Sequence, residues 1–183
     1  MTFKKFQILA ATISFLLFGW VMQATAADYT HELKDKDMSF AWSVDGDNLA
    51  VKLSAKTEGW VGIGFNPSKS MKDANFILGY VKKGEAKIID EFGEKEKTHK
   101  SDKKLGGTTD VTLVGGTEEG GVTTIEFTLP LKSADKYDQA LNVAGDTTVL
   151  LGYGAGRDSF RAKHKYRSTY IVNLSTGVSS KAK

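Results

Sequence analysis

The sequence contains no cysteine and only three histidines. Without cysteine, the chain cannot form disulfides, iron–sulfur clusters, thiolate zinc sites, lipoprotein anchors or thioether links to haem. The histidines His31, His99 and His164 form no i, i+2 or i, i+4 pair, which argues against a zinc or copper site built from several histidines. The fold must therefore be held by a hydrophobic core, with or without a ligand.

Familiar catalytic signatures are also missing. The sequence has no G-x-S-x-G elbow, no H-E-x-x-H pair and no Walker loop. The segment GYGAGRDSF, which begins at Gly152, lacks the third glycine of a dinucleotide-binding loop and has no βαβ pattern around it. Carboxylates are plentiful, but they lie in turns and mixed-charge runs. The sequence therefore carries no recognised catalytic motif, and we expect a protein that is not an enzyme.

Residues 1–27 have the pattern of a cleavable secretory signal peptide. Lys4 and Lys5 form its basic start, residues 8–22 form an apolar stretch, and ATA at positions 24–26 is a small-x-small cleavage pattern. No later segment has the length and hydrophobicity of a membrane span, so we expect a periplasmic or extracellular protein. Cleavage lowers the formal charge from +3 to +1, which argues against nucleic acid or a bulk anionic membrane as a partner.

The rest of the chain alternates apolar and polar residues with a period of two almost throughout. Turns rich in glycine or aspartate separate the short apolar runs, as at DGDN (residues 45–48) and KKGE (residues 82–85). Strands are expected near residues 38–44, 49–53, 60–65, 76–81, 86–92, 111–114, 122–129, 148–153 and 169–174. This spacing predicts one all-β domain over residues 28–174, an antiparallel sandwich or barrel.

Four segments depart from this pattern. Only residues 131–141 look helical, as a short connection after Pro130. The charged residues 94–104 are typical of a solvated loop, and residues 115–121 of a plain hairpin loop. Residues 175–183 are expected to form a flexible tail.

Met71 is unusual in its surroundings. It lies in a polar turn, between the apolar runs WVGIGF (from Trp60) and FILGYV (from Phe76). Methionine often fills irregular gaps in a core, so packing beneath the turn is the simplest interpretation of Met71 alone.

A longer pattern around Met71 resembles a known family. The run from Trp60 to Phe92 is similar to the DOMON domain, the secreted β-sandwich module found in cellobiose dehydrogenase cytochromes and dopamine β-monooxygenase. The matching residues are Trp60, Gly62, Gly64, Phe65, Met71, Ala74, Gly79, Tyr80, Val81, Asp90 and Phe92. The segment from Gly152 to Leu174 resembles the closing element of the family. This resemblance implies an immunoglobulin-like antiparallel β-sandwich with one short helical connection.

The resemblance also implies a cofactor. In haem-binding members, a methionine from the first loop and a histidine from the late loop ligate a noncovalent b-type haem. Those positions are Met71 and His164 here. The chain departs from the family at Asn75, where an aspartate is frequent, and some relatives ligate through lysine, so Lys163 and Lys165 remain alternatives to His164.

Other residues near these two in sequence are candidates for the haem pocket. Aromatic residues that could line it are Phe65, Phe76, Tyr80, Phe160 and Tyr166. Each of them could equally be ordinary sandwich core. Basic residues that could pair with the haem propionates are Arg157, Arg161, Lys163 and Arg167. The alternative for these is a basic rim that keeps the loop solvated.

The function implied is one-electron transfer outside the cytoplasm with a redox partner protein. Thioether and imidazole close the coordination shell of iron, which favours electron transfer over oxygen chemistry. A non-redox module that binds carbohydrate or another small ligand is the main alternative, because Trp42, Trp60 and the tyrosines could stack on sugar rings. A third possibility is a subunit that relays electrons in a larger periplasmic oxidoreductase.

Overall fold

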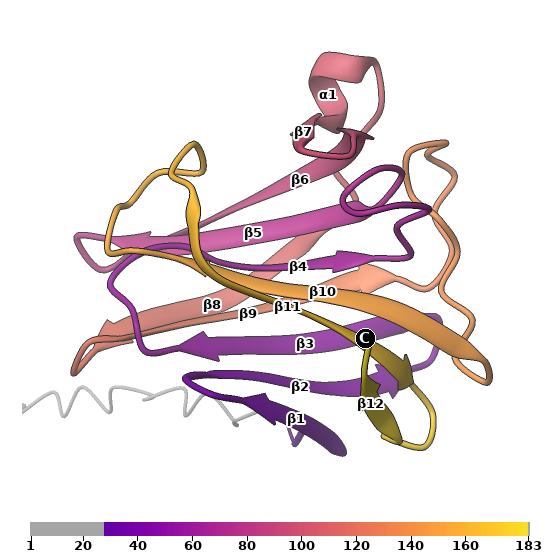
Figure 1. Cartoon of the computed structure of the whole chain (residues 1–183), viewed down its shortest axis with the longest axis horizontal. Coiled ribbons are helices and arrows are strands. Elements are labelled where there is room, and N and C mark those ends of the chain that lie inside the picture. The colour runs from indigo at the N-terminus through magenta and orange to yellow at the C-terminus, as the bar shows by residue number, and fades with distance from the viewer. Residues whose placement is uncertain (1–27, 183) are drawn as a thin grey trace, which may run out of the picture.

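The computed structural model describes residues 28–182, which form two antiparallel sheets packed face to face (Figure 1). This confirms the predicted antiparallel β-sandwich with one short helix. The expected signal peptide, residues 1–27, lies outside the described residues. Within residues 28–182 the only helix has four residues, too few to cross a membrane.

The two sheets contain five and seven strands. The first sheet has the order β1 (His31–Asp35), β2 (Met38–Asp45), β3 (Asn48–Ala55), β9 (Val122–Pro130) and β8 (Thr112–Glu119). The second has the order β12 (Ser179–Lys181), β11 (His164–Asn173), β10 (Asp146–Gly154), β4 (Val61–Phe65), β5 (Asn75–Lys82), β6 (Glu85–Lys95) and β7 (Thr98–Ser101). The helix α1 (Asp102–Leu105) follows β7.

The two tight turns expected from the sequence join hairpins. Asp45 pairs with Asn48 across the β2–β3 turn, and Lys82 pairs with Glu85 across the β5–β6 turn. In the second turn, Lys83 and Gly84 have φ angles of 54° and 78°. Positive φ at both central residues is the requirement of a type I′ turn, whose twist matches that of the flanking strands.

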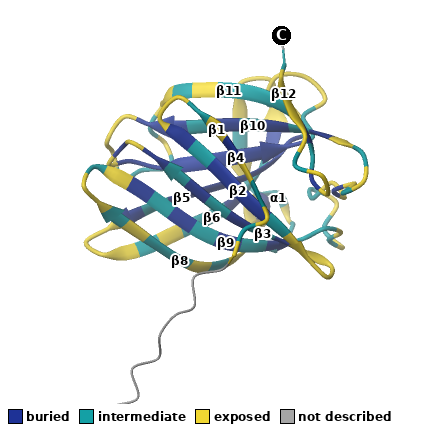
Figure 2. Ribbon diagram, turned by 90° about the horizontal axis from the view of Figure 1, so that it is seen from below, coloured by how far each residue is buried: buried dark blue, intermediate teal, exposed yellow. Residues whose placement is uncertain are grey.

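The main core lies between the sheets, and alternate residues of β3, β9 and β10 are buried in it (Figure 2). Phe40 and Trp42 are fully buried, and their rings stack with centroids 4.4 Å apart. The indole Nε1 of Trp42 donates a hydrogen bond to the carbonyl of Leu174 at 2.9 Å, so its polar atom is satisfied inside the core. Burial of this kind leaves Trp42 unable to stack on a sugar.

The short helix lies elsewhere than expected. Residues 131–141 form an irregular loop, because side chains bond the backbone in place of helical hydrogen bonds. Ser133 Oγ accepts from the N–H of Asp135 at 2.8 Å, and a carboxylate oxygen of Asp135 accepts from the N–H of Tyr137 at 3.0 Å. The expected solvated loop, residues 94–104, instead contributes the end of β6, all of β7 and most of α1.

Two other boundaries differ from expectation. Strand β8 continues through most of the expected loop 115–121, to Glu119, and β9 begins at Val122. This leaves only Gly120 and Gly121 as the turn, with φ angles of 59° and 75°. Within the expected flexible tail, residues 179–181 form β12, which pairs with β11 from Tyr170 to Val172. Pairing with β11 supplies hydrogen bonds that no local sequence pattern indicated.

Asp35 ties the first sheet to the end of the chain. Its carboxylate accepts hydrogen bonds from the hydroxyl of Tyr166 in β11 and from the ammonium of Lys181 in β12, the latter at 2.9 Å. Burial alone would raise the pKa of Asp35, but these hydrogen bonds outweigh it and lower the pKa to about 2.

We predict that Asp35 makes stability depend on pH in acid. Because its folded pKa lies below its unfolded value of 3.8, ionised Asp35 stabilises the fold above that pH, and the contribution is lost as pH falls towards 2. Urea unfolding should show Asp35→Asn less stable than the parent at pH 5, with the difference shrinking at pH about 2. The exposed control Asp28→Asn should show no such convergence. A constant difference across this range would contradict the prediction.

We also predict that the two sheets are too close to accept a methyl group at Gly79. A Cβ there would lie 2.8 Å from Cγ1 and Cγ2 of Ile125 on β9. Gly79→Ala should therefore lower the free energy of unfolding by about 1–3 kcal/mol, as overpacked cores do. Gly115→Ala is the matched control, since nothing lies within 4 Å of its added Cβ. Equal stability of the two variants in denaturant melts would refute close approach at Gly79.

Candidate functional site

Strand β4 is buried on both faces, which is unusual for a strand of an antiparallel sheet. Val61, Ile63 and Phe65 face the main core, so the intervening Gly62 and Gly64 face outward. An added Cβ on Gly64 would lie 2.4 Å from the ring of Phe76 on β5. The glycines thus let large side chains from neighbouring segments lie flat over the outer face of β4.

These side chains form a second apolar group, which we call the outer-face cluster. Its buried members are Trp60, Ala74, Phe76 and Leu78, and its partly buried members are Met71, Tyr80, Ile89, Leu150, Phe160 and Ala162. The outer face of an antiparallel sheet is commonly polar. An apolar group of this kind, away from the main core, is therefore a candidate ligand-binding surface.

Two loops reach this cluster from opposite ends of the strands. Strands β4 and β10 are antiparallel, with Phe65 opposite Val149 and Val61 opposite Tyr153. The loop of residues 66–74, which carries Met71, follows Phe65. The loop of residues 155–163, which leads to His164, begins at the other end (Figure 1).

The loop of residues 155–163 is held down on the sheet. The Nε1 of Trp60 donates to the carbonyl of Ala162 at 2.9 Å. The ring of Phe160 contacts that of Tyr80, with centroids 4.5 Å apart. An added Cβ on Gly59 would lie 2.9 Å from the backbone nitrogen of Arg157, so this glycine allows the close approach of the loop.

The Met71 loop is held by its backbone. The N–H of Met71 donates to the carbonyl of Glu96 at 3.3 Å, and that of Asp73 donates to the carbonyl of Gly93 at 2.7 Å. An added Cβ on Gly93 would lie 1.8 Å from the carbonyl oxygen of Met71, so only glycine fits there. The position of Met71 therefore depends on β6 and the turn after it.

The predicted aromatic residues separate into two groups. Phe76, Tyr80 and Phe160 lie in the outer-face cluster with Met71. Phe65 is fully buried in the main core, and Tyr166 packs against that core on the other side of the sheet. The strict alternation of strand side chains puts Phe65 on the face opposite Gly64.

The predicted ligand and basic residues of the late segment lie at the surface. Arg157, Arg161, Lys163, His164, Lys165 and Arg167 are all exposed. They come from the loop that covers the outer-face cluster and from the start of β11. This arrangement gives the cluster a basic rim at the end opposite Met71.

His99, which lies in the charged segment of residues 94–104, contacts the outer-face cluster. Its ring lies 5.2 Å from that of Phe76, and its Nδ1 hydrogen-bonds to a carboxylate oxygen of Glu91. The residue belongs to β7, a strand that the charged sequence of residues 94–104 did not predict. Since the Met71 loop contacts the same β6–β7 connection, His99 and Met71 lie at the same end of the sheet.

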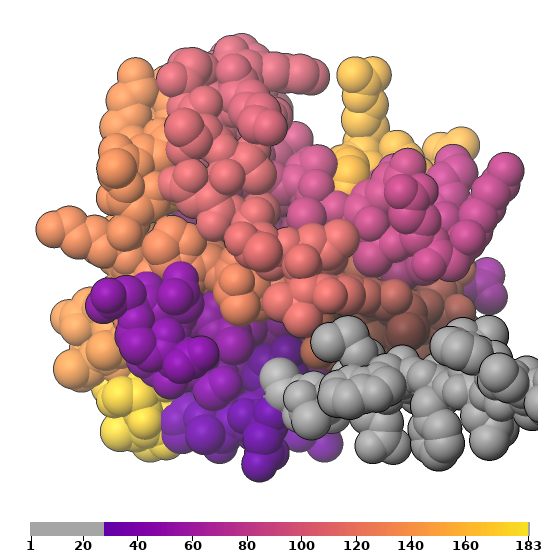
Figure 3. All heavy atoms as spheres, turned by 180° about the vertical axis from the view of Figure 1, so that it is seen from behind, coloured from indigo at the N-terminus to yellow at the C-terminus, as the bar shows by residue number. Residues whose placement is uncertain are grey.

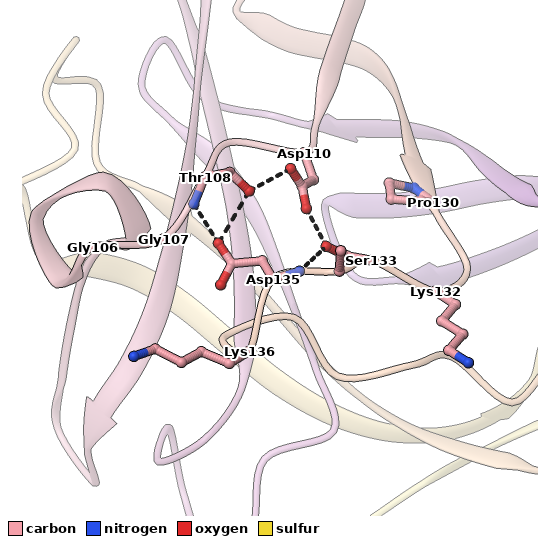
Figure 4. Close-up of a pocket in the computed structure, with 10 residues that line it drawn as sticks. Gly106, Gly107, Thr108, Asp110, Pro130, Lys132, Ser133, Asp135 and Lys136 are labelled. Atoms are coloured by element: carbon pink, nitrogen blue, oxygen red, sulfur yellow. Dashed lines mark hydrogen bonds between the residues drawn. The ribbon is translucent and has the colours of Figure 1, made fainter.

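The larger cavity of the described residues lies away from this cluster. It has a volume of about 760 Å³ and is lined by residues 106–108, 110, 130 and 132–136. These two segments lie side by side at the top of the face shown in Figure 3. Figure 4 shows their connection, in which Thr108, Asp110, Ser133 and Asp135 bond to one another. No predicted haem residue lines this cavity.

The outer-face cluster fits a noncovalent haem in its chemistry. An apolar face of aromatic and aliphatic side chains suits the edges of a porphyrin, and Met71 and His164 offer a thioether and an imidazole from opposite ends. Basic side chains that could meet propionates lie beside His164. Phe65 and Tyr166 take no part in this surface.

The comparisons with known proteins agree with the fold. The profile of the DOMON domain family matches residues 34–154. Among solved structures, the chain is similar to the cytochrome b domain of pyranose dehydrogenase from Coprinopsis cinerea, with a TM-score of 0.62, 11% identity and coverage of 80% of this chain and 82% of that one. It is also similar to the cytochrome domain of Myriococcum thermophilum cellobiose dehydrogenase, with a TM-score of 0.57, 10% identity and coverage of 76% and 79%.

The curated relatives are longer proteins. DBH-like monooxygenase protein 1 of Homo sapiens is 31% identical over 137 residues, which are 73% of this chain and 21% of the relative. MOXD1 homolog 2 of Drosophila melanogaster is 26% identical over 126 residues, which are 68% and 16%. The chain thus spans about a fifth of the length of the relatives that it matches.

We predict that the indole N–H of Trp60 fixes the loop of residues 155–163. Trp60→Phe keeps an aromatic ring but removes the donor to the Ala162 carbonyl. The variant should lose only about 1 kcal/mol of stability, the net value of one hydrogen bond. Amide hydrogen exchange of residues 155–163 should accelerate, while that of β2 and β3 should not. Unchanged exchange in the loop would show that packing alone holds it.

Proposed function

Since the chain belongs to the DOMON domain family, we propose that it binds one b-type haem through Met71 and His164 and transfers single electrons to or from a redox partner. This is a role in electron transfer rather than in catalysis by the chain itself. The observation that carries the proposal is the outer-face cluster, an apolar surface with a thioether loop at one end and an imidazole loop at the other.

Each part of the surface has a separate task in this proposal. Phe76, Leu78 and Tyr80 offer the apolar floor, which excludes water from the bound group. Arg157 and Arg161 offer guanidinium groups to carboxylates at the rim. Haem, when bound, supplies a one-electron iron couple. The thioether of Met71 favours the reduced metal, which raises the reduction potential.

Binding requires the loop of residues 155–163 to shift. Phe160 and Ala162 rest on the cluster, and Phe160 packs against Tyr80. The loop has a few definable attachments, above all the hydrogen bond from Trp60 to Ala162, which makes opening of the loop local rather than global.

The positions of the side chains support His164 rather than His99 as the second ligand. Two side chains that held one haem iron would have to reach it from different sides of the bound group. Met71 and His164 come from loops at opposite ends of the sheet, whereas His99 comes from the same end as Met71. Lys163 and Lys165 share the end that carries His164, so they are the alternatives that an experiment must separate.

The partner and the compartment are part of the same proposal. Both structural neighbours are named as cytochrome domains of dehydrogenases, which supports a dehydrogenase as the electron partner, either separate or as part of a larger oxidoreductase. The signal-peptide pattern of residues 1–27 supports action in the periplasm or outside the cell.

The carbohydrate-binding alternative loses its main support. Trp42 is fully buried between the sheets, and Trp60 is 7% exposed beneath the loop of residues 155–163. With this loop in place, neither ring offers an open face for a sugar. No observation on the described residues favours this alternative over haem.

We predict that the purified protein, titrated with haemin, develops a Soret band typical of low-spin six-coordinate haem. Met71→Ala and His164→Ala should each abolish the low-spin spectrum, because each removes one axial donor. Met71→Ala should also lower the reduction potential, measured by spectroelectrochemistry. Circular dichroism should show that both variants keep their β-sheet content.

Three matched variants test the ligand assignment. His31→Ala removes a histidine far from the cluster and should leave the spectrum unchanged. His99→Ala should also keep the low-spin spectrum, and Lys163→Ala with Lys165→Ala should do the same. A low-spin spectrum that survives His164→Ala, or is lost in His99→Ala, would refute His164 as a ligand. Absence of any Soret band would refute haem binding.

A further inference from the structure

Three aspartates converge at the edge of the core, away from the outer-face cluster. They are Asp90 in β6, Asp102 at the start of α1 and Asp138 in the loop between β9 and β10, and one oxygen of each lies within 4.8 Å of one oxygen of the others. Asp90 pairs with Ile77, so it lies on the core-facing side of the sheet. Three elements distant in sequence thus bring their carboxylates to one point.

The environment of these carboxylates is dry and unneutralised. Asp90 is 3% exposed and Asp102 is 0% exposed. Among residues 28–182 none of the three forms an ion pair. Both oxygens of Asp102 and one oxygen of Asp90 have no hydrogen-bond partner. Buried carboxylates are normally paired, hydrogen-bonded or bound to a metal, so this group lacks its counter-charge.

Asn75 adds an independent observation. It is 6% exposed, and its amide Nδ2 donates to a carboxylate oxygen of Asp138. That bond leaves its Oδ1 buried without a partner. The amide oxygen of a residue that already contacts Asp138 is a neutral ligand of the kind that Ca²⁺ takes alongside aspartates.

Two neighbouring aspartates show what a satisfied carboxylate looks like here. Asp110 accepts hydrogen bonds from the hydroxyls of Ser133 and Thr108, and Asp135 accepts from the N–H groups of Thr108 and Tyr137. Hydrogen bonding from Ser133 lowers the pKa of Asp110. Neighbouring hydroxyl and N–H groups therefore satisfy Asp110 and Asp135, whereas neither carboxylate oxygen of Asp102 has a donor.

The three central carboxylates behave in the opposite way. Burial, followed by repulsion from Asp90, raises the pKa of Asp102 to about 7 and that of Asp138 to about 8. Burial likewise raises the pKa of Asp90 to about 6. These directions are those of a cluster that needs bound protons or a bound cation.

The space at the cluster is small. A cavity of about 10 Å³ adjoins Asp90 and Asp138 but not Asp102, and its other lining residues are Asn75, Ile77, Asp110, Val111, Leu129, Pro130 and Gln139. One water needs roughly 10–15 Å³ by the same measure, so the cavity has room for about one small ion and no water shell. Mg²⁺ usually keeps several of its waters, whereas Ca²⁺ accepts irregular all-protein oxygen sites.

We propose that Asp90, Asp102 and Asp138, together with Oδ1 of Asn75, bind one Ca²⁺ ion. The donors are all oxygen, which suits a hard cation and not zinc or copper. The ion joins the paired strands β5 and β6 to α1 and to the loop of residues 131–141. It thereby closes one end of the sandwich, independently of any haem.

The site also adjoins the Met71 loop. Asn75 follows that loop directly, and the Nε2 of Gln139 donates to the carbonyl of Asp73 at 2.8 Å. An ion that fixes Asn75 and residues 131–141 would therefore hold the end of the Met71 loop at two points: through the chain at Asn75 and through the hydrogen bond from Gln139 to Asp73. This connection needs no ligand on the outer face.

The test is a calcium titration of the chelator-treated, haem-free protein. We expect isothermal calorimetry to report one site for CaCl₂ and at least about tenfold weaker binding of MgCl₂. Saturating CaCl₂ should raise the midpoint of thermal unfolding by several degrees, because only the folded chain assembles the site. No heat and no shift with millimolar CaCl₂ would overturn the proposal.

Variants place the binding at the cluster. Asp102→Asn and Asp138→Asn should each weaken Ca²⁺ binding at least about tenfold, since each removes a charged ligand. Asp102→Asn should also raise the unfolding midpoint of the metal-free protein, because a neutral amide relieves repulsion that the ion would otherwise neutralise. The exposed control Asp45→Asn should change neither quantity. Full Ca²⁺ affinity in both cluster variants would overturn the assignment.

Discussion

Burial of β4 and β5 on both faces is the constraint on which the rest of this structure depends. An antiparallel sandwich needs only one apolar face per sheet. Here Gly62 and Gly64 open the outer face of β4, and Phe76 and Leu78 of β5 cover it. The same strands send Ile63 and Ile77 into the main core. One short stretch of chain therefore builds both the core and a second apolar surface.

That second surface gives the connecting loops their roles. The position of a loop is set by the end of the strand that it follows. Because β4 pairs antiparallel with β10, the Met71 and His164 loops lie at opposite ends of these two strands. Trp60 belongs to the cluster and also bonds the loop before His164. The proposed haem site thus uses the apolar face for affinity and the sheet topology for the separation of the two donors.

The inner edge of the same sheet contrasts with this apolar surface. Asp90 lies in β6 on the core-facing side, where Asp102 and Asp138 join it from elements that carry little apolar area. Concentrated buried charge costs free energy unless something neutralises it. In the proposed Ca²⁺ site, a bound cation would neutralise the three carboxylates and link the segments that carry them.

Local chemistry in the sequence determined most of the strands, although not β1, β7 and β12, together with the tight turns and the presence of Met71 in a loop. Period-two alternation and turn residues act over a few neighbours, so they can be recognised locally. The motif from Trp60 to Phe92 also indicated the family correctly. Only the tertiary structure decided that Phe65 and Tyr166 face the core, that His99 touches the outer cluster, and that charged residues 94–104 include a strand and a helix. It alone united Asp90, Asp102 and Asp138, since convergence of residues far apart in a chain depends on sheet pairing that no local pattern encodes.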